Sequence, residues 1–213
     1  MELFSLKGKT VAITGASSGF GHHFAGVLAS SGASLILGAR RLDKIRDRVN
    51  EINDSGGKAL GVALDVRDPD SCESFLSTAQ KEYGTIDVLI NNAGLGGSKS
   101  VIDMEDDEWH RVIDVTLTGT MRMTRAALKH MQSRGKGVIV NNASVLGWRA
   151  QTEQAHYAAA KAGVMALTRC SALEAAEFGV RINAVSPSIA VHDFLKKTSS
   201  EELLNKLVKN EAF

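Results

Sequence analysis

The stretch TVAITGASSGFG, residues 10–21, decides how the rest of the sequence is interpreted. It begins with an uninterrupted apolar run, which is typical of a strand buried on both faces of a sheet. Gly15, Gly19 and Gly21 follow, and an amphipathic segment with a helical pattern comes next. A strand, a glycine-rich turn and a helix in this order favour a dinucleotide site, because the turn backbone and the helix N-terminus can approach a pyrophosphate. The alternative is a tight turn that needs glycine for backbone reasons alone.

Short apolar runs alternate with longer amphipathic segments along the chain. The sequence predicts strands at 10–14, 34–39, 59–64, 86–91, 137–142 and 180–185. It predicts helices at about 19–31, 41–54, 69–83, 107–134 and 154–178. Because strands that alternate with helices form parallel sheets with right-handed crossovers, we expect an α/β fold, a doubly wound parallel sheet covered on both faces. No linker or repeat divides the sequence, so we expect residues 1–213 to form a single domain.

The composition excludes several classes of protein. Lys and Arg number 25 against 24 Asp and Glu, for a net charge of +1, which gives no electrostatic case for binding nucleic acid or an anionic membrane. The N-terminus has no signal-peptide pattern, and no apolar run reaches the roughly 20 residues that span a bilayer. The cysteines, Cys72 and Cys170, form no disulfide framework and indicate a reducing compartment. We therefore expect a cytoplasmic protein.

The end of the second predicted strand indicates which dinucleotide is bound. Sites for NAD usually have Asp or Glu here, to hydrogen-bond the ribose 2′-hydroxyl. This sequence instead has Arg40 and Arg41, and no carboxylate before Asp43. A guanidinium suits a phosphate better than a hydroxyl, by its charge and its forked donors, so the sequence predicts NADP over NAD. The alternative is a basic residue that opens an exposed helix.

The segment AHYAAAKAGV, residues 155–164, places Tyr157 and Lys161 four positions apart in an alanine-rich helical pattern. Residues at this spacing lie on one helix face. Taken alone, the spacing favours a tyrosine ring packed on a lysine stem at the surface. In a dinucleotide-binding chain another interpretation gains weight. A free phenol has a pKa of about 10, and an adjacent ammonium would lower it toward the range that a proton donor for ketone reduction needs.

Five motifs, taken together, resemble the short-chain dehydrogenase/reductase superfamily. They are TGASSGFG (14–21), LDV (64–66), NNAG (91–94), Ser144 and YAAAK (157–161). The resemblance implies a Rossmann-type fold of three layers with strand order 3-2-1-4-5-6-7. It also implies an oxidoreductase that transfers a hydride between NADP(H) and a ketone or secondary alcohol, with acyl-CoA or steroid-ring-derived compounds among the candidate substrates. In the family, the helices that match 117–131 and 162–176 pair across a two-fold axis, so a homodimer or homotetramer is expected.

The resemblance assigns roles by position. Tyr157 becomes the catalytic acid or base, Lys161 its partner, and Ser144 the group that orients the substrate carbonyl. Asp65 and Val66 would contact the adenine. The complete set of expected cofactor contacts is Gly15, Ser17, Ser18, Gly19, Phe20, Gly21, Arg40, Arg41, Asp65, Val66, Asn92, Ala93, Gly94, Tyr157, Lys161, Pro187 and Ile189.

The sequence departs from the family pattern at several places. Thr116 stands where an asparagine commonly holds a water in a proton relay, and we expect it to take part in an altered relay. Ser188 replaces a glycine, and His192 stands where a threonine often binds the nicotinamide carboxamide. The segment 186–204 would form the substrate lid, and the chain is expected to lack the family's last helix and strand. These departures keep a second interpretation open, a cofactor-binding regulatory protein of the same fold without turnover.

No metal site is predicted. His22 and His23 are neighbours on a predicted helix, so they point to different sides and cannot easily chelate one ion. The acidic run DMEDDE, residues 103–108, lacks the spacing of a metal loop. It fits the start of a helix, where carboxylates face the positive end of the helix dipole.

Overall fold

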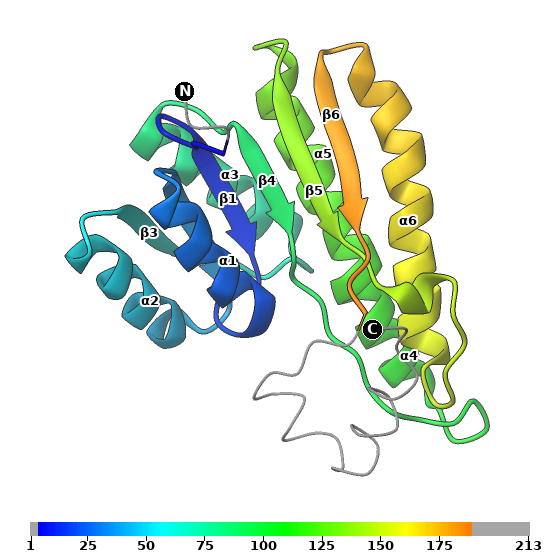
Figure 1. The fold of residues 1–213 in the computed structure, drawn as a ribbon. Coiled ribbons are helices and arrows are strands. Elements are labelled where there is room, and N and C mark those ends of the chain that lie inside the picture. Colours follow the sequence, from blue (N-terminus) through cyan, green and yellow to red (C-terminus); the bar gives the residue numbers. More distant parts are fainter. Residues whose placement is uncertain (1–3, 189–213) are drawn as a thin grey trace.

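Six parallel strands form one sheet in a computed structural model that describes residues 4–188 (Figure 1). The order across the sheet is β3-β2-β1-β4-β5-β6. The strands are β1 (Thr10–Thr14), β2 (Ser34–Ala39), β3 (Lys58–Ala63), β4 (Val88–Asn91), β5 (Gly137–Asn142) and β6 (Val180–Val185). The predicted strands are confirmed, with β3 shifted by one residue and β4 beginning two residues later than expected. The expectations for Ile189, for His192 and for most of the substrate lid at 186–204 concern residues outside the described range. The same holds for the expected absence of the family's last helix and strand.

Helices cover both faces of the sheet, as a doubly wound α/β fold requires (Figure 1). One face carries α1 (Gly19–Ser30) and α2 (Leu42–Asp54), and the other carries α3 (Pro69–Tyr83), α5 (Gly119–Gln132) and α6 (Ala155–Ala176). Strand β1 shows how one run serves both faces. Val11 and Ile13 belong to the core under α1 and α2, whereas Ala12 belongs to the opposite core. Because successive side chains on a strand alternate, a continuous apolar run fills both layers.

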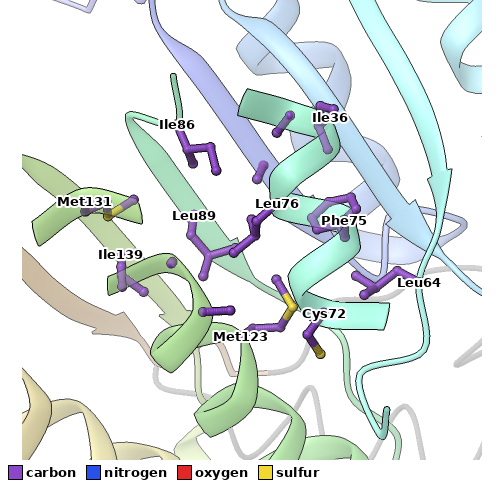
Figure 2. Close-up of a cluster of buried hydrophobic side chains, with 14 of the residues drawn as sticks. Ile36, Leu64, Cys72, Phe75, Leu76, Ile86, Leu89, Met123, Met131 and Ile139 are labelled. Atoms are coloured by element: carbon purple, nitrogen blue, oxygen red, sulfur yellow. The ribbon is translucent and has the colours of Figure 1, made fainter. Parts of the chain in front are cut away.

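The larger core lies between the sheet and α3 and α5 (Figure 2). Phe75 and Leu76 of α3 are fully buried there against Leu89 of β4. A side chain of this size contributes roughly 1.5–3 kcal/mol when it is removed from water. Gly38 in β2 makes room for the Phe75 ring, since a Cβ at position 38 would lie 2.7 Å from that ring. The glycine inside a buried strand is therefore a packing requirement.

The boundaries of α3 follow from its end residues. The Asp68 carboxylate accepts a hydrogen bond of 2.9 Å from the N–H of Asp70, and Pro69 begins the helix. Gly84 ends it in the left-handed conformation, with φ of 74°. The predicted start of this helix at 69 is confirmed, and an aspartate cap followed by a proline accounts for it.

The single helix predicted over 107–134 is wrong in one respect. It divides into α4 (Asp106–Ile113), a π-helical turn (Asp114–Thr118) and α5. Such a turn is a one-residue insertion that widens the helix, and it occurs frequently at functional sites. The Thr120 hydroxyl donates to the Thr116 carbonyl at 2.8 Å, which satisfies one backbone group inside the widened turn. The acidic run does open α4, as predicted, with Asp106, Asp107 and Glu108 in the first turn.

The described part of the chain lacks two features that are typical of other classes of protein. No helix within residues 4–188 is long and apolar enough to cross a membrane. No group of three or more His, Cys, Asp or Glu in the same range could hold a metal ion.

Asp87 ties three strands together at the amino edge of the sheet. Its carboxylate accepts hydrogen bonds of 3.0 Å from the Thr10 N–H and from the Arg134 guanidinium. Its carbonyl accepts from Val138 at the start of β5 at 2.9 Å. Burial alone would raise the pKa of Asp87, but the hydrogen bonds from Thr10 and Arg134 outweigh burial and hold the pKa below its ordinary value.

Replacing Asp87 with Asn should therefore destabilise the protein in a pH-dependent way. At pH 7 we expect a loss of about 1–2 kcal/mol in the free energy of unfolding, since hydrogen bonds to a charged group are lost. A depressed carboxyl pKa stabilises the fold above the unfolded-state value and loses that effect as pH falls through the folded-state value. The difference from the parent should therefore shrink below the ordinary value of 3.8. Urea unfolding from pH 7 to 3 measures this, with the exposed Asp47→Asn as control; a constant difference across that range would contradict the assignment.

Candidate active site

The candidate site lies at the carboxyl edge of the sheet, where β1 and β4 separate. The chain leaves β1 toward α1 on one face and leaves β4 toward α5 on the other (Figure 1). In open α/β sheets, ligands bind in the crevice that such a switch opens. Most of the predicted contacts within residues 4–188 follow the carboxyl ends of strands or lie in the first turn of α1. Tyr157 and Lys161 lie in the first two turns of α6. Because the strands are parallel, those ends meet at one edge, and the structure brings the predicted residues together.

The turn after β1 and the start of α1 depend on glycine at three positions. Gly15 has φ of +67°, and a Cβ there would lie 2.8 Å from the Ala93 Cα. A Cβ at Gly21 would lie 2.4 Å from the Gly15 carbonyl oxygen. The alternative of a purely conformational glycine turn therefore accounts for part of the motif. Gly19 also has a positive φ, +56°, which favours glycine, but the space around its missing Cβ is open within 4 Å.

The start of α1 is suited to an anion. Ser18 precedes the helix in an extended conformation, and its side chain makes no capping hydrogen bond. No acidic residue stands in the first turn of α1. Helix N-terminal N–H groups attract negative charge, so an open, uncapped start beside Gly19 fits a phosphate-bearing ligand.

Asn92 holds this turn against β4. Its Nδ2 donates to the carbonyls of Thr14 and Gly15, both at 3.1 Å. The Thr14 hydroxyl in turn accepts from the N–H groups of Asn92 at 3.0 Å and Ala93 at 2.9 Å. Asn92 is one of the expected cofactor contacts. The structure places its amide against the glycine-rich turn.

The basic residues at the end of β2 lie beside the turn. Arg41 Nη2 donates to the Ser17 hydroxyl at 3.4 Å, which connects two of the predicted contacts. Arg40 is exposed at the strand end. The nearby Asp65 carboxylate is taken up by Arg67 instead, at 2.6 Å. The side-chain hydrogen bond from Arg67 is the largest influence on Asp65 and holds the pKa of that carboxyl below its usual value.

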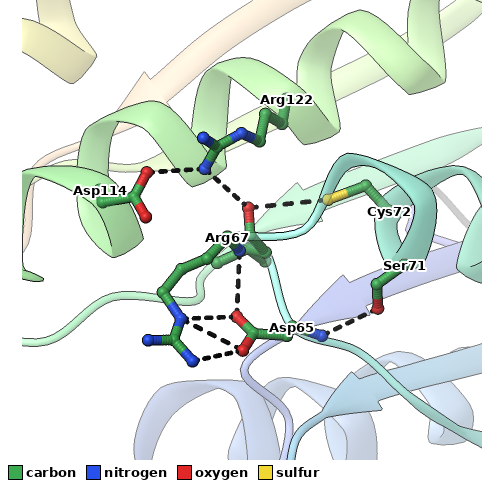
Figure 3. A network of polar contacts seen from close by, with 7 residues as sticks. Asp65, Arg67, Ser71, Cys72, Asp114 and Arg122 are labelled. Atoms are coloured by element: carbon green, nitrogen blue, oxygen red, sulfur yellow. Dashed lines mark hydrogen bonds and ion pairs between the residues drawn. The ribbon is translucent and has the colours of Figure 1, made fainter.

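The loop after β3, which contains Asp65 and Val66, is anchored from two helices (Figure 3). The Val66 carbonyl accepts from Arg122 of α5 at 3.4 Å and from the Cys72 thiol of α3 at 3.7 Å. Arg122 also pairs with Asp114, the first residue of the π turn, at 2.7 Å. Burial raises the pKa of the Cys72 thiol to about 11, so this sulfur stays protonated and unreactive at neutral pH.

Ser144, Tyr157 and Lys161 come together beside the ends of β4 and β5. Lys161 is only 5% exposed, and its Nζ donates to the Asn142 carbonyl at 2.5 Å. The same Nζ lies 5.6 Å from the centre of the Tyr157 ring. Ser144 is also buried, and its hydroxyl accepts from the Leu146 N–H at 3.2 Å.

The predicted depression of the Tyr157 pKa is wrong for the protein alone. Burial raises the pKa of Tyr157, and the hydrogen bond with Ser144 offsets this only in part. Burial also lowers the pKa of Lys161 to about 8. The ammonium makes its hydrogen bond with the Asn142 carbonyl, so desolvation dominates the phenol. The spacing of the two residues predicted their proximity but not this burial.

Thr116 is fully buried in the π turn and clamps the segment after β4. Its hydroxyl donates to the Leu95 carbonyl at 3.0 Å and accepts from the Leu95 N–H at 3.1 Å. A Cβ at Gly94 would lie 3.5 Å from the Thr116 hydroxyl and 3.8 Å from Lys161 Nζ. The only hydroxyl proton is therefore engaged by Leu95. A role for Thr116 in proton transfer stays a prediction.

Two further predicted contacts lie at the margins of the site. The Phe20 ring stacks on Phe24 in α1, with 5.7 Å between ring centres. The Pro187 carbonyl accepts from the Val145 N–H at 3.2 Å, which places the end of β6 beside Ser144.

The sequence analysis missed Asn142. Its Nδ2 donates to Asn92 Oδ1 at 2.9 Å, and its carbonyl is the acceptor for Lys161. A signal was available, because the dipeptide Asn-Asn at 91–92 recurs at 141–142 at the end of another apolar run. Two amides at the end of a buried strand are unexpected unless they have polar partners.

These features define a dinucleotide-binding α/β protein with a buried serine, a half-buried tyrosine and a buried lysine beside the nucleotide crevice. Residues 9–203 match the family described as short chain dehydrogenase, and the chain belongs to the short-chain dehydrogenase/reductase family. It is an oxidoreductase acting on keto or hydroxyl groups, in a family that binds a nicotinamide nucleotide.

Several relatives are similar over most of their length. A (5R,7aS)-5-hydroxy-7a-methyl-1-oxo-2,3,5,6,7,7a-hexahydro-1H-indene-carboxyl-CoA reductase of Mycobacterium tuberculosis is 52% identical, over 98% of this chain and 80% of that protein. The 3-oxoacyl-[acyl-carrier-protein] reductase of Vibrio cholerae is 36% identical, over 93% of this chain and 80% of its own. The crystal structure of a short chain dehydrogenase from Mycobacterium smegmatis matches with a TM-score of 0.85 and 50% identity, over 88% of this chain and 80% of that one.

Replacing Thr116 with Val should destabilise the protein by about 1–3 kcal/mol, because the Leu95 N–H and carbonyl lose their partner while the side-chain shape is kept. Thr116→Ser, which keeps the hydroxyl, should lose less. Urea unfolding of the two variants against the parent gives the comparison. Equal stability of the valine and serine variants would show that the hydroxyl does not clamp Leu95.

Proposed function

We propose that this chain is an NADP(H)-dependent reductase that interconverts a ketone and a secondary alcohol on a ring-containing acyl-CoA substrate. The observation that carries the proposal is the meeting of Ser144, Tyr157 and Lys161 with the glycine-rich turn at one edge of the sheet. The three side chains belong to the predicted catalytic set, which also includes Thr116, and their arrangement supports proton transfer to a carbonyl oxygen. The relative that acts on a hydroindene-carboxyl-CoA supports the substrate class.

The residues at the crevice fit a nicotinamide dinucleotide phosphate. The turn at Gly15 to Gly21 and the uncapped start of α1 would hold the pyrophosphate, and Gly19 leaves open space for it. The remaining contacts are assigned by position: Arg40, Arg41 and Ser17 to the 2′-phosphate, Asp65 and Val66 to the adenine, and Asn92, Ala93, Gly94 and Lys161 to the nicotinamide ribose. When bound, such a nucleotide supplies the hydride.

The side chains of Tyr157, Ser144 and Lys161 would carry out the proton transfer. Because burial raises the pKa of Tyr157, its phenol holds its proton at neutral pH and can donate it to the carbonyl oxygen. Ser144 would hydrogen-bond the same oxygen and hold it near the phenol. Lys161, with its Nζ 5.6 Å from the ring centre, would stabilise the negative charge that develops on Tyr157 as the proton leaves. A pKa of about 8 keeps most of this lysine charged at pH 7.

Apolar surface at the same edge supports a hydrophobic substrate. Val101 and Ile102, in the segment after β4, are 75% and 92% exposed. Trp148, in the segment after β5, is 69% exposed. Rings of a substrate could cover such side chains, since burying apolar area is favourable at about 25 cal/mol per Å².

Other features of the proposal concern the whole protein. We include a single catalytic domain over 1–213, a homodimer or homotetramer, and a cytoplasmic location. Leu173, 78% exposed on α6, supports a contact between subunits there. Free thiols at Cys72 and Cys170 agree with a reducing compartment.

The cofactor assignment is tested at the end of β2. Arg40→Ala should weaken NADPH binding by about 1.5–3 kcal/mol, the range for a hydrogen bond to a charged group, and hardly change NADH binding. Arg41→Ala should act in the same direction, because Arg41 reaches Ser17. Fluorescence titration of each variant with both nucleotides gives the four dissociation constants. A parent that prefers NADH, or variants that lose both nucleotides equally, would contradict the 2′-phosphate assignment.

The proton donor is tested by Tyr157→Phe. We expect NADPH affinity to be kept and turnover to fall about 10²–10⁴-fold, since a positioned acid contributes that much. A carbonyl-compound panel that includes cyclic keto acyl-CoA thioesters, followed at the nicotinamide absorbance, measures turnover. Tyr83→Phe, the other tyrosine of the chain, is the matched control and should retain activity. A Tyr157→Phe protein with a tenth or more of the parental rate would exclude the role, and a parent that binds NADPH without turnover would favour a regulatory protein.

A further inference from the structure

The same dipeptide, Asn-Asn, closes β5 and begins at the last residue of β4, and the two strands lie in register with Asn91 opposite Asn141. Asn91 Nδ2 donates to Asn141 Oδ1 at 2.9 Å. One residue further on, Asn142 Nδ2 donates to Asn92 Oδ1, also at 2.9 Å. Because successive side chains alternate, the two amide pairs lie on opposite faces of the sheet.

The two pairs serve different surroundings. The first pair extends into the helices, since Asn91 also donates to Thr124 of α5 at 3.1 Å and Asn141 donates to Thr168 of α6 at 2.9 Å. All four side chains of that network are buried. It therefore joins strands to helices inside the core. The second pair, Asn92 and Asn142, instead reaches the glycine-rich turn.

The orientation of the second pair is fixed by its donors. The Nδ2 of an asparagine carries two protons, and Asn92 uses them on the carbonyls of Thr14 and Gly15. Its Oδ1 must therefore face Asn142. Two amide oxygens cannot hydrogen-bond each other, so Asn142 must present its nitrogen. The pair has one favourable arrangement, set by the carbonyls of the turn.

Asn142 has a second contact through its main chain. Its carbonyl accepts the hydrogen bond from Lys161 Nζ at 2.5 Å. Lys161 is almost fully buried, so this carbonyl is an important partner for a charge removed from water. A continuous path of contacts therefore runs from the Gly15 carbonyl through Asn92 and Asn142 to Lys161.

We propose that Asn142 is a positioning residue that fixes the glycine-rich turn relative to Lys161. Its effect on nucleotide binding and turnover rests on the proposed function, whereas the link itself is a property of the folded chain. The informative change is Asn142→Asp, which keeps the shape and replaces the donor with an oxygen. That oxygen either repels Asn92 Oδ1 or forces the Asn92 amide to turn over and lose its hydrogen bonds with Thr14 and Gly15.

The test combines two measurements on the full chain. Hydrogen exchange of the backbone amides at 14–18 is followed in the protein without nucleotide, and NADPH binding is titrated by fluorescence. For Asn142→Asp we expect about tenfold faster exchange in the turn and an about tenfold higher dissociation constant, the scale of one hydrogen bond. Asn142→Leu, which removes the donor without adding charge, should act in the same direction but less strongly.

The matched control is Thr124→Val, which removes an acceptor for Asn91 on the opposite face. It should lower the melting temperature while exchange at 14–18 and NADPH affinity stay at the parental values. If Asn142→Asp behaves like this control, the proposal is overturned. If Asn142→Asp does not fold, the same comparison with Asn142→Leu decides. A parent that binds no NADPH, together with faster exchange in the Asn142 variants, would refute the proposed function and support the link.

Discussion

The side-chain amide of Asn92 is the contact on which the candidate site depends. It lies where β1 and β4 part, and its two protons hold the carbonyls of Thr14 and Gly15. This close approach leaves no room for a side chain at Gly21, where a Cβ would lie 2.6 Å from the amide nitrogen. The glycine pattern therefore serves the strand crossing as well as the open ligand face at Gly19. The Asn92 amide therefore holds the glycine-rich turn in place, and the other residues of the site lie around that turn.

Burial gives the site its acid–base character. Removing a phenol and an ammonium from water moves their pKa values apart, upward for Tyr157 and down to about 8 for Lys161. The proton of the phenol is therefore held until negative charge develops elsewhere, and the lysine stabilises charge at that moment. The Asn142 carbonyl keeps the ammonium in place meanwhile. A solvated pair with the same spacing would have neither property.

The sequence was sufficient for the strands, the helices and the family, because continuous apolar runs and short motifs are local signals. Asp68 and Pro69, for example, are adjacent residues that by themselves favour a helix start. The π turn was missed because an apolar pattern with a period of 3.6 residues does not show one inserted residue. The position of Thr116 in the family pattern drew attention to this residue. Its hydrogen bonds with Leu95, however, join two segments that are distant in the sequence. Asn142 was missed for the same reason, since its meaning comes from Asn92, fifty positions away.

The π turn at Asp114–Thr118 changes the rotation of α4 about the helix axis relative to α5. A single extra residue rotates α4 by about 100° about the helix axis relative to α5, because a turn takes 3.6 residues. Glu108 thereby comes within 3.5 Å of His156, the neighbour of Tyr157, while Arg122 still reaches the loop after β3. Loss of one residue in this turn would restore a regular helix and re-aim α4, and it would also disturb Thr116, which lies in the turn and holds Leu95. The direction of α4 relative to α5 can thus change in evolution by a change of length alone.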